Sequence, residues 1–284
     1  MIAVVVITHN RLHLLRRNVE DVLSRTSPQT TEVVVWDNAS DDGTREYLSA
    51  WRDPRVRVVS HRDNIGQNAY ARAFATTRAP YLVELDDDVI SAPEGWDAIL
   101  LDAFRALPRM GYLAANLADD PHDTAVRYIR YLREERRAYR RAVENGIAIL
   151  EGPTGGGCTM TSREVYNRVG GFREHPSLVY WREDADYAAR VRKHGFRCAI
   201  LEGLEVVHHG GPHYSPPTAA KVRLHELEHR RRARRDPIKR LLLRLPLVAR
   251  VNDRLGWFEA PHAYDPTRWG AEVAGRDEPD GRHE

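Results

Sequence analysis

Four short apolar runs alternate with segments of helical character in the first third of the chain, and this alternation restricts the fold more than any other feature. Each run is rich in the β-branched and aromatic residues that are typical of strands. The runs are Ile2–Ile7, Glu32–Trp36, Val56–Val59 and Tyr81–Leu85. Strands that alternate with helices favour a parallel sheet with right-handed crossovers. We therefore predict an α/β fold with a mostly parallel sheet flanked by helices.

Three consecutive acidic residues, Asp86–Asp88, follow the fourth run directly. Adjacent carboxylates repel one another unless a cation lies among them. Mg²⁺ and Mn²⁺ prefer such hard oxygen ligands, and Mg²⁺ is usually held by one or two carboxylates together with substrate phosphates. On an extended segment Asp86 and Asp88 point the same way, while Asp87 points elsewhere. The triplet therefore indicates a metal–diphosphate site, with an acidic turn after a strand as the alternative.

Polar side chains also follow the first two predicted strands. In a parallel sheet the carboxyl ends of the strands lie along one edge, where ligands bind in open α/β folds. The side chains suited to a nucleotide are Thr8 and Asn10 after the first strand, Asp37 and Asn38 after the second, and Asp86 and Asp88 after the fourth. Because three sets share this placement, we expect them to converge on one ligand.

Composition narrows the class of protein only a little. Lys and Arg (43) nearly balance Asp and Glu (41), and the acidic triplet argues against a nucleic-acid partner. The two cysteines, Cys158 and Cys198, lack the spacing of a zinc site, which favours a reduced, cytosolic compartment. We expect neither a signal peptide nor a membrane span, since no apolar stretch of about 18 residues occurs. A chain of 284 residues is long enough for one large α/β domain with appendages.

Four motifs occur in an order and spacing that carry a family resemblance. They are Val4–Arg11, Val35–Thr44, Asn64–Asn68 and Asp86–Asp88. Together they closely resemble glycosyltransferase family 2, whose members are inverting enzymes with the Rossmann-like GT-A fold. The resemblance covers residues 1–215 and implies transfer of a sugar from a nucleotide-diphosphate donor to an acceptor hydroxyl.

The resemblance also implies roles for particular residues. The position of Asp37 usually meets the base, and Asp86 and Asp88 form the DxD element that holds the metal ion and the diphosphate. The remaining donor-binding set is Thr8, Asn10, Arg11, Asn38, Asn68 and Asp87. We expect Mn²⁺ or Mg²⁺ as the cofactor and a UDP-, GDP- or dTDP-sugar as the donor. The acceptor hydroxyl is expected on a glycan, a lipid-linked substrate or a natural product.

The acid pair Glu183–Asp184 stands at the start of a predicted helix. Acids at a helix N-terminus are favoured by the dipole, whatever their function. The resemblance implies that Asp184 is the general base, with Asp186 in a supporting role. A histidine farther on, His208 or His209, matches the family's third metal ligand, and the His-x-Gly-Gly pattern favours His208. An imidazole ligand suits Mn²⁺ better than Mg²⁺.

Two arginine-rich segments lie outside these motifs. Residues 121–145 predict one long helix, which is either solvated at the domain edge or forms a basic lip for an anionic acceptor or a membrane headgroup. Farther on, Arg230–Arg235 precede an apolar stripe from Ile238 to Val248. That pattern fits an interfacial helix on an anionic membrane, and equally a helix packed against the domain with its basic face in solvent.

The predicted organisation has three parts. Residues 1–215 form the catalytic domain, with a nucleotide-sugar half at 1–115 and an acceptor-side half at 116–215 that contains the helical insertion 121–145. Residues 216–269 form a basic helical extension, and residues 270–284 a disordered tail. We expect a cytoplasmic protein, with peripheral association at the inner face of the membrane as one alternative.

Two other functions stay open. A sugar-phosphate nucleotidyltransferase also uses a Rossmann-like sheet, acids and Mg²⁺. It needs a glycine-rich phosphate loop after the first strand, where this chain has Thr8–Arg11 without a glycine. The other alternative is a catalytically inactive protein that binds sugar nucleotides, against which the intact Asp86, Asp88 and Asp184 argue.

Overall fold

The computed structural model describes residues 1–176 and 180–216, together with a few positions between 222 and 248. The chain divides into two compact units, Met1–Ser215 and Pro216–Glu284. All the helices and strands given below belong to the first unit. The predicted extension 216–269 and tail 270–284 lie almost entirely outside the described residues.

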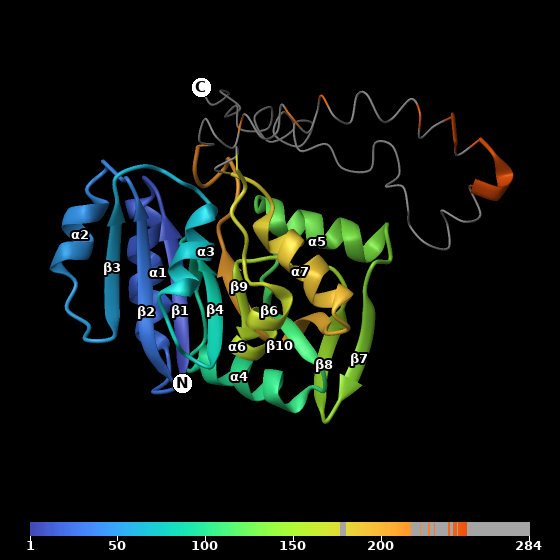
Figure 1. Ribbon diagram of the computed structural model, residues 1–284, viewed down its shortest axis with the longest axis horizontal. Helices are drawn as coiled ribbons and strands as arrows, with labels where there is room; N and C mark the ends of the chain where they lie inside the picture. Colours follow the sequence, from blue (N-terminus) through green and yellow to red (C-terminus); the bar gives the residue numbers. More distant parts are fainter. Residues whose placement is uncertain are drawn as a thin grey trace, which may run out of the picture. The chain divides into compact units, whose positions relative to one another are not determined.

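The first half of this unit contains a parallel sheet, as predicted (Figure 1). Its strands lie in the order β3–β2–β1–β4. They are β1 (Ile2–Thr8), β2 (Thr30–Asn38), β3 (Val56–His61) and β4 (Tyr81–Asp86). Every residue of β1 is buried, which explains the unbroken apolar run of a strand that is covered on both faces.

The second half continues the same sheet with mixed strand directions. Its strands are β5 (Val89–Ser91), β6 (Met110–Leu117), β7 (Arg140–Glu144), β8 (Ile147–Glu151), β9 (Cys158–Ser162) and β10 (Arg197–His208). The order continues β4–β9–β6–β10–β8–β7, and β5 pairs with β10. β9 runs antiparallel to both β4 and β6, whereas β10 runs parallel to β6.

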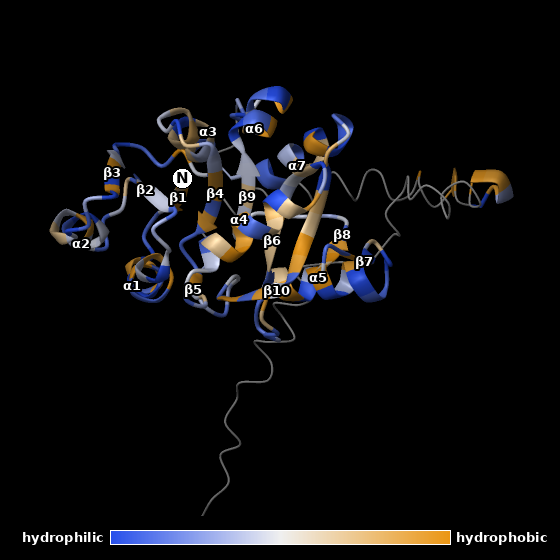
Figure 2. Ribbon diagram, turned by 90° about the horizontal axis from the view of Figure 1, so that it is seen from below, coloured by the Kyte–Doolittle hydropathy of each residue, from blue (hydrophilic) through white to orange (hydrophobic). Residues whose placement is uncertain are grey.

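Helices cover both faces of the sheet. They are α1 (Leu12–Asp21), α2 (Thr44–Ala50), α3 (Asn68–Ala75), α4 (Trp96–Ala106), α5 (Thr124–Glu134), α6 (Arg163–Val169) and α7 (Glu183–Lys193), with a 3₁₀ turn at Leu23–Arg25. Figure 2 shows α3, α6 and α7 on one side of the sheet and α1 on the other. Each side has its own apolar core: Leu15 and Leu100 belong to one, Phe74 and Tyr187 to the other. This layering is the predicted α/β architecture.

The prediction of one long helix over residues 121–145 is wrong. α5 ends at Glu134, and Arg137 (φ 47°) adopts a left-handed conformation through which a helix cannot continue. β7 follows and pairs with β8 across a turn at Asn145 and Gly146, both of which have positive φ. An Asn-Gly pair is the signal of a two-residue hairpin, and here it outweighs the arginine-rich helical pattern.

The predicted interfacial helix stays a prediction. Except for its first residue, Arg230–Arg235 lies outside the described part of the chain. Four of the apolar side chains described beyond it are exposed: Ile238 (61%), Leu241 (63%), Leu245 (53%) and Leu247 (75%). No helix among the described residues is long and apolar enough to cross a membrane.

Candidate active site

The carboxyl ends of β1, β2 and β4 meet at one edge of the sheet. Parallel pairing sets Thr8 opposite Asp37 and Ile7 opposite Asp86. Thr8 is 2% exposed and therefore lines the interior of this edge. Arg11, which directly precedes α1, reaches across to the acidic triplet. The three predicted sets of polar residues are thus neighbours.

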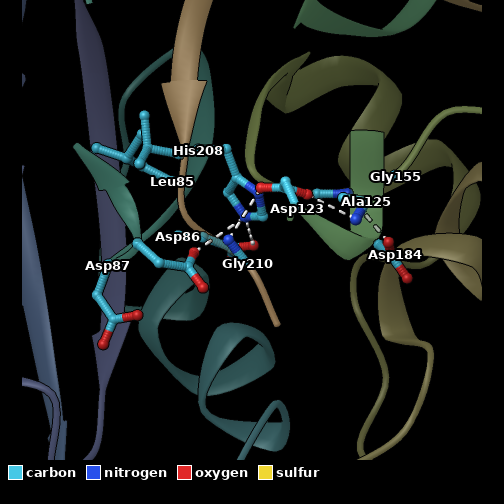
Figure 3. A network of polar contacts seen from close by, with 12 residues as sticks. Leu85, Asp86, Asp87, Asp123, Ala125, Gly155, Asp184, His208 and Gly210 are labelled. Atoms are coloured by element: carbon cyan, nitrogen blue, oxygen red, sulfur yellow. Dashed lines mark hydrogen bonds and ion pairs between the residues drawn. The ribbon is translucent and has the colours of Figure 1, made fainter. Parts of the chain in front are cut away.

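Two of the triplet's acids form a cluster with His208 at the end of β10 (Figure 3). The Nε2 atom of His208 lies 3.0 Å from Asp88 Oδ1 and 4.0 Å from Asp86 Oδ2. One ligand atom from each of the three residues lies within 4.8 Å of the others. The pairing of β10 with β5 sets His208 opposite Val89 and so brings the histidine next to the triplet.

The donor set of this cluster suits a divalent cation. Two carboxylates match the preference of Mg²⁺ and Mn²⁺ for oxygen, and an imidazole nitrogen is acceptable to Mn²⁺. Across the described residues, it is the one group of at least three His, Cys, Asp or Glu side chains that could hold a metal ion. His209, the other candidate, stacks on Tyr214 with ring centroids 3.9 Å apart.

Asp123, which the sequence analysis missed, orients His208. Its Oδ2 lies 2.6 Å from His208 Nδ1 and accepts a hydrogen bond from Gly210 N at 2.9 Å. Its Oδ1 caps α5 by accepting from Ala125 N at 2.6 Å and Val126 N at 3.0 Å. The available signal was an aspartate in front of a helical run, which marks an N-cap but not a partner for a distant histidine.

Two cationic side chains offset the repulsion within the acidic triplet. Burial opposes protonation of His208, but Asp88 and Asp123 raise its pKa well above the ordinary value. The Arg11 Nη1 donates to Asp88 Oδ2 at 2.6 Å and lies 3.2 Å from Asp87 Oδ1. Burial raises the pKa of Asp87 to about 7, although Arg11 acts in the opposite direction.

Tyr70 fixes one oxygen of Asp86. Its hydroxyl donates to Asp86 Oδ1 at 2.9 Å, and the ring is fully buried against Phe74 and Phe172. Burial and the charge of Asp88 raise the pKa of Asp86. The other oxygen, Oδ2, is the one that faces the histidine of the cluster.

Several residues predicted to meet the nucleotide are engaged in holding loops together. Asp37 is 0% exposed; its two oxygens accept from Ser40 N at 3.0 Å and from Arg45 Nε at 2.9 Å. Asn10 accepts from Asp41 N at 2.8 Å, and its own N–H donates to Ser40 Oγ at 3.0 Å. Direct contact between Asp37 and a base therefore stays a proposal.

The two asparagines predicted to meet the donor, Asn38 and Asn68, also have structural partners. Asn38 Nδ2 donates to Gly66 O at 3.1 Å. Asn68 Oδ1 accepts from His175 N at 2.8 Å and from Trp181 Nε1 at 3.1 Å. These bonds join α3 and the loops beside it, so both residues shape the edge of the sheet.

Asp184 lies in the first turn of α7, against the glycine-rich segment between β8 and β9 (Figure 3). Its Oδ2 accepts from Gly156 N at 3.0 Å and its Oδ1 from Ala185 N at 2.6 Å. A Cβ at Gly155 would stand 2.9 Å from Asp184 Oδ2, so this approach requires a glycine. The glycines at 155 and 156 therefore allow the backbone to approach the proposed base closely.

Two buried acids lie near Asp184: Glu183, which the sequence analysis paired with it, and Glu84, which the sequence analysis missed. Glu84 in β4 is 2% exposed and Glu183 is 6% exposed. Burial, followed by the charges of Asp184 and Asp86, raises the pKa of Glu84 well above its ordinary value. Burial and Asp184 act on Glu183 in the same way. The signal for Glu84 was an acid inside an otherwise apolar strand.

Comparison with known proteins identifies the family. Residues 3–170 match the sequence model of Glycosyl transferase family 2. The chain belongs to this family. It is a transferase enzyme, so the resemblance carried by the four motifs is confirmed, and the family match favours a glycosyltransferase over a nucleotidyltransferase.

Two curated relatives of this glycosyltransferase are 27% and 26% identical to it over the aligned residues. An N-acetylglucosaminyl-diphospho-decaprenol L-rhamnosyltransferase of Mycobacterium tuberculosis (strain CDC 1551 / Oshkosh) is 27% identical over 220 residues, covering 66% of this chain and 69% of the relative. An uncharacterized protein, y4gI, of Sinorhizobium fredii is 26% identical over 229 residues, covering 74% of this chain and 24% of that protein.

Solved structures show that the glycosyltransferase has the GT-A fold. Mannosyltransferase PcManGT from Pyrobaculum calidifontis, in complex with GDP-Man and Mn²⁺, gives a TM-score of 0.57 at 20% identity, covering 97% of this chain and 75% of that one. GalNAc-T7 with UDP, GalNAc and Mn²⁺ gives 0.54 at 17% identity, covering 73% of this chain. The match spans only 43% of the GalNAc-T7 chain.

Proposed function

We propose that this glycosyltransferase moves a sugar from a nucleotide-diphosphate donor to an acceptor hydroxyl with inversion at the anomeric carbon. The observation that carries the proposal is that two groups of site residues lie close enough to buried Glu84 for their charges to raise its pKa. One is the Asp86–Asp88–His208 cluster, and the other is Asp184. The first suits a cation and a diphosphate, and the second suits a proton acceptor.

Asp86, Asp88 and His208 would hold the divalent cation, Mn²⁺ or Mg²⁺. When bound, the cation supplies positive charge that stabilises the leaving diphosphate. The two structural relatives that were solved with Mn²⁺ support this assignment. Asp123 occupies Nδ1 of His208, which leaves Nε2 directed at the two aspartates. Arg11, bonded to Asp88, is placed to contact the diphosphate as well.

Asp184 would take the proton of the acceptor hydroxyl. As that oxygen bonds to the anomeric carbon, the bond from the carbon to the diphosphate oxygen breaks, and attack from the opposite face inverts the centre. The carboxylate is already held by Gly156 N and Ala185 N, so little ordering is needed before reaction.

The donor is proposed to be a UDP-, GDP- or dTDP-sugar. The relatives solved with GDP-Man and with UDP support a nucleotide donor. Its base and ribose would lie along the edge shaped by Thr8, Asn10, Asp37, Asn38 and Asn68. Residues 1–115 would then be the nucleotide-sugar half and residues 116–215 the acceptor-side half.

The acceptor is proposed to be lipid-linked. The name of the mycobacterial relative, which specifies a diphospho-decaprenol, supports this choice over a soluble glycan or natural product. A lipid-linked acceptor is compatible with a cytoplasmic protein that binds peripherally to the inner face of an anionic membrane.

Thermal unfolding with a panel of nucleotide-diphosphate sugars tests the donor and the metal together. We expect one donor to raise the melting temperature in Mn²⁺ and to lose this effect in excess chelator. Asp88→Asn should abolish the stabilisation, while Asp119→Asn, a change at an exposed acid, should preserve it. Donor stabilisation that persists in chelator would refute the metal role. A product with retained anomeric configuration, detected by NMR, would refute inversion.

A further inference from the structure

A second cavity, of about 310 Å³, lies at the end of α7 remote from Asp184. Its volume is within the usual range for small-molecule sites. Its walls come from the segment after α5, the end of β8, the end of α7 and the start of β10. None of the residues assigned above to the metal, the donor or the proton transfer lines it.

Two of the four arginines that line this cavity are neutralised by acids. Arg197 donates to both oxygens of Glu144 at 2.8 Å and to both oxygens of Glu151 at 3.2 Å. Arg140 pairs with Glu151 as well. Two carboxylates therefore balance these two guanidinium groups.

The other two arginines, Arg137 and Arg192, leave the cavity with excess positive charge. Neither forms an ion pair with an acidic side chain in the part of the chain that the structure describes. Both are exposed at the cavity. Arg137 (φ 47°) also has a left-handed backbone conformation, which glycine adopts most readily. The position therefore carries an arginine although the backbone conformation favours glycine.

Aromatic rings form two of the walls. Tyr139 lies directly against the backbone of Gly152, where an added Cβ would stand 2.6 Å from the ring atom Cδ1. Phe196 has the guanidinium carbon of Arg168 at 5.4 Å from its ring centroid. Arginine binds phosphate through paired N–H donors, and aromatic walls accommodate a ring or an apolar group attached to it.

We infer that this cavity binds a small phosphate-bearing ligand, with its anion on Arg137 and Arg192 and the rest of the molecule against Tyr139 and Phe196. The site is separate from the donor site. Gly152 lies at the rim of this cavity and begins the segment that contacts Asp184 through Gly156. We therefore expect a ligand in the cavity to influence the proposed base.

Pyrophosphate and inorganic phosphate are suitable probes, titrated calorimetrically into the full-length protein in metal-free buffer. The cavity variant combines Arg137→Gly with Arg192→Ala; glycine suits the left-handed position, so this change does not threaten folding. The matched control combines Arg136→Ala with Lys193→Ala, which removes the same charge from adjacent positions outside the cavity. We expect the cavity variant to bind pyrophosphate at least about tenfold more weakly than the wild type and the control.

Three results would overturn the inference: no pyrophosphate binding by the wild type at millimolar concentration, unchanged binding by the cavity variant, or an equal loss in the control. Vesicles that contain phosphatidic acid identify the source of the phosphate. Vesicle capture that falls only in the cavity variant supports a lipid headgroup as the ligand. Equal capture of both variants, with pyrophosphate binding lost only in the cavity variant, supports a soluble ligand.

Discussion

At the scale of single residues, the acids of the candidate site differ in what their partners allow them to do. Asp88 faces His208, its proposed partner at the cation, and Arg11, which is proposed to contact the diphosphate. Asp184 is held by backbone amides and stays available to a substrate proton. Glu84 is buried and lies near the charges of Asp184 and Asp86, so it favours the protonated form. Three carboxylates a short distance apart thus have three different environments.

Replacing Asp123 with Asn should separate its two tasks. Asn retains a side-chain oxygen that can cap α5, but it loses the carboxylate shared by His208 and Gly210. We expect Mn²⁺ affinity, measured by calorimetry, to fall by about 10- to 100-fold, the range found when the partner of a metal-bound histidine is removed. Asp119→Asn, which removes an exposed ion pair with Arg130, is the control. Unchanged Mn²⁺ affinity would show that His208 needs no orienting partner.

Asp184→Asn should affect chemistry more than donor binding. Loss of a general base lowers turnover by at least about a hundredfold, whereas donor affinity should change little because the donor contacts lie elsewhere. Initial rates of sugar transfer and calorimetric donor affinity measure the two effects. Asp186→Asn is the matched control, since that carboxylate pairs with Arg190 at 2.9 Å within α7. Near-normal turnover in Asp184→Asn would move the base to Glu183 or Asp186.

Glu84 should make stability depend on pH. Burial raises the pKa of this carboxyl in the folded protein above the unfolded value of about 4.3. The folded form keeps a proton that the unfolded form releases, so the contribution of Glu84 is neutral below about pH 4.3 and increasingly destabilising above it. Glu84→Gln should raise the melting temperature at pH 7, with a gain that shrinks toward pH 4. Exposed Glu94 serves as control through Glu94→Gln. A gain that does not vary with pH would mean that Glu84 is ionised in the folded protein.

At the scale of elements, the β7–β8 hairpin shows how a short turn can override a longer pattern. Residues 140–144 continue an arginine-rich sequence that favours a helix, yet they pair with β8. The Asn145-Gly146 turn closes the hairpin, and Arg137 ends the helix before it. Formation of the hairpin in turn places Arg140 and Tyr139 at the second cavity.

Gly146→Ala tests the turn. Gly146 has φ 78° and no atom within 4 Å of an added Cβ, so the only cost is backbone strain. We expect a loss of about 1–2 kcal/mol in the free energy of unfolding, measured with urea. Gly203→Ala is the control, because Gly203 also has open space but lies outside the left-handed region. Equal effects of the two changes would show that the turn does not depend on positive φ.

At the scale of the whole molecule, the chemistry belongs to the unit Met1–Ser215. This unit contains the sheet edge, the acid cluster, the proposed base and the second cavity. The family match, residues 3–170, also falls within it. For the unit from Pro216 onward, contact with an anionic surface stays a prediction that rests on its arginine-rich sequence.

Vesicle co-sedimentation tests whether the C-terminal unit binds an anionic membrane. Arg230–Arg235 contain five arginines, and each basic residue near an anionic membrane contributes about 1 kcal/mol. The exposed Leu241 and Leu245 add apolar area. We expect the full-length protein to bind anionic but not neutral vesicles, less strongly in high salt and not at all after truncation following Tyr214. Leu241→Ser combined with Leu245→Ser should weaken binding. If the full-length protein ignores anionic vesicles at low salt, a soluble acceptor becomes the better proposal.

Local patterns were enough to predict the parallel half of the sheet and the family. The apolar runs that became β1, β2, β3 and β4 specify strands through their own side chains, and the acids after β4 follow directly in the chain. The hairpin at Asn145 was wrongly predicted as part of a helix, although its turn signal is a local pair of residues. Such features depend on neighbours in sequence, which a single sequence displays in full.

Long-range packing determined the partners within the site. His208 meets Asp123 across 85 positions, and Arg11 meets Asp88 across 77. Nothing local to Asp123 distinguishes a helix cap from the partner of a distant histidine. The raised pKa of Glu84 likewise arises from its burial near the charges of Asp184 and Asp86, which is a property of the packed molecule. Residue type and spacing indicate which chemistry a side chain can perform. The folded arrangement decides which groups that side chain faces and which charge state it adopts.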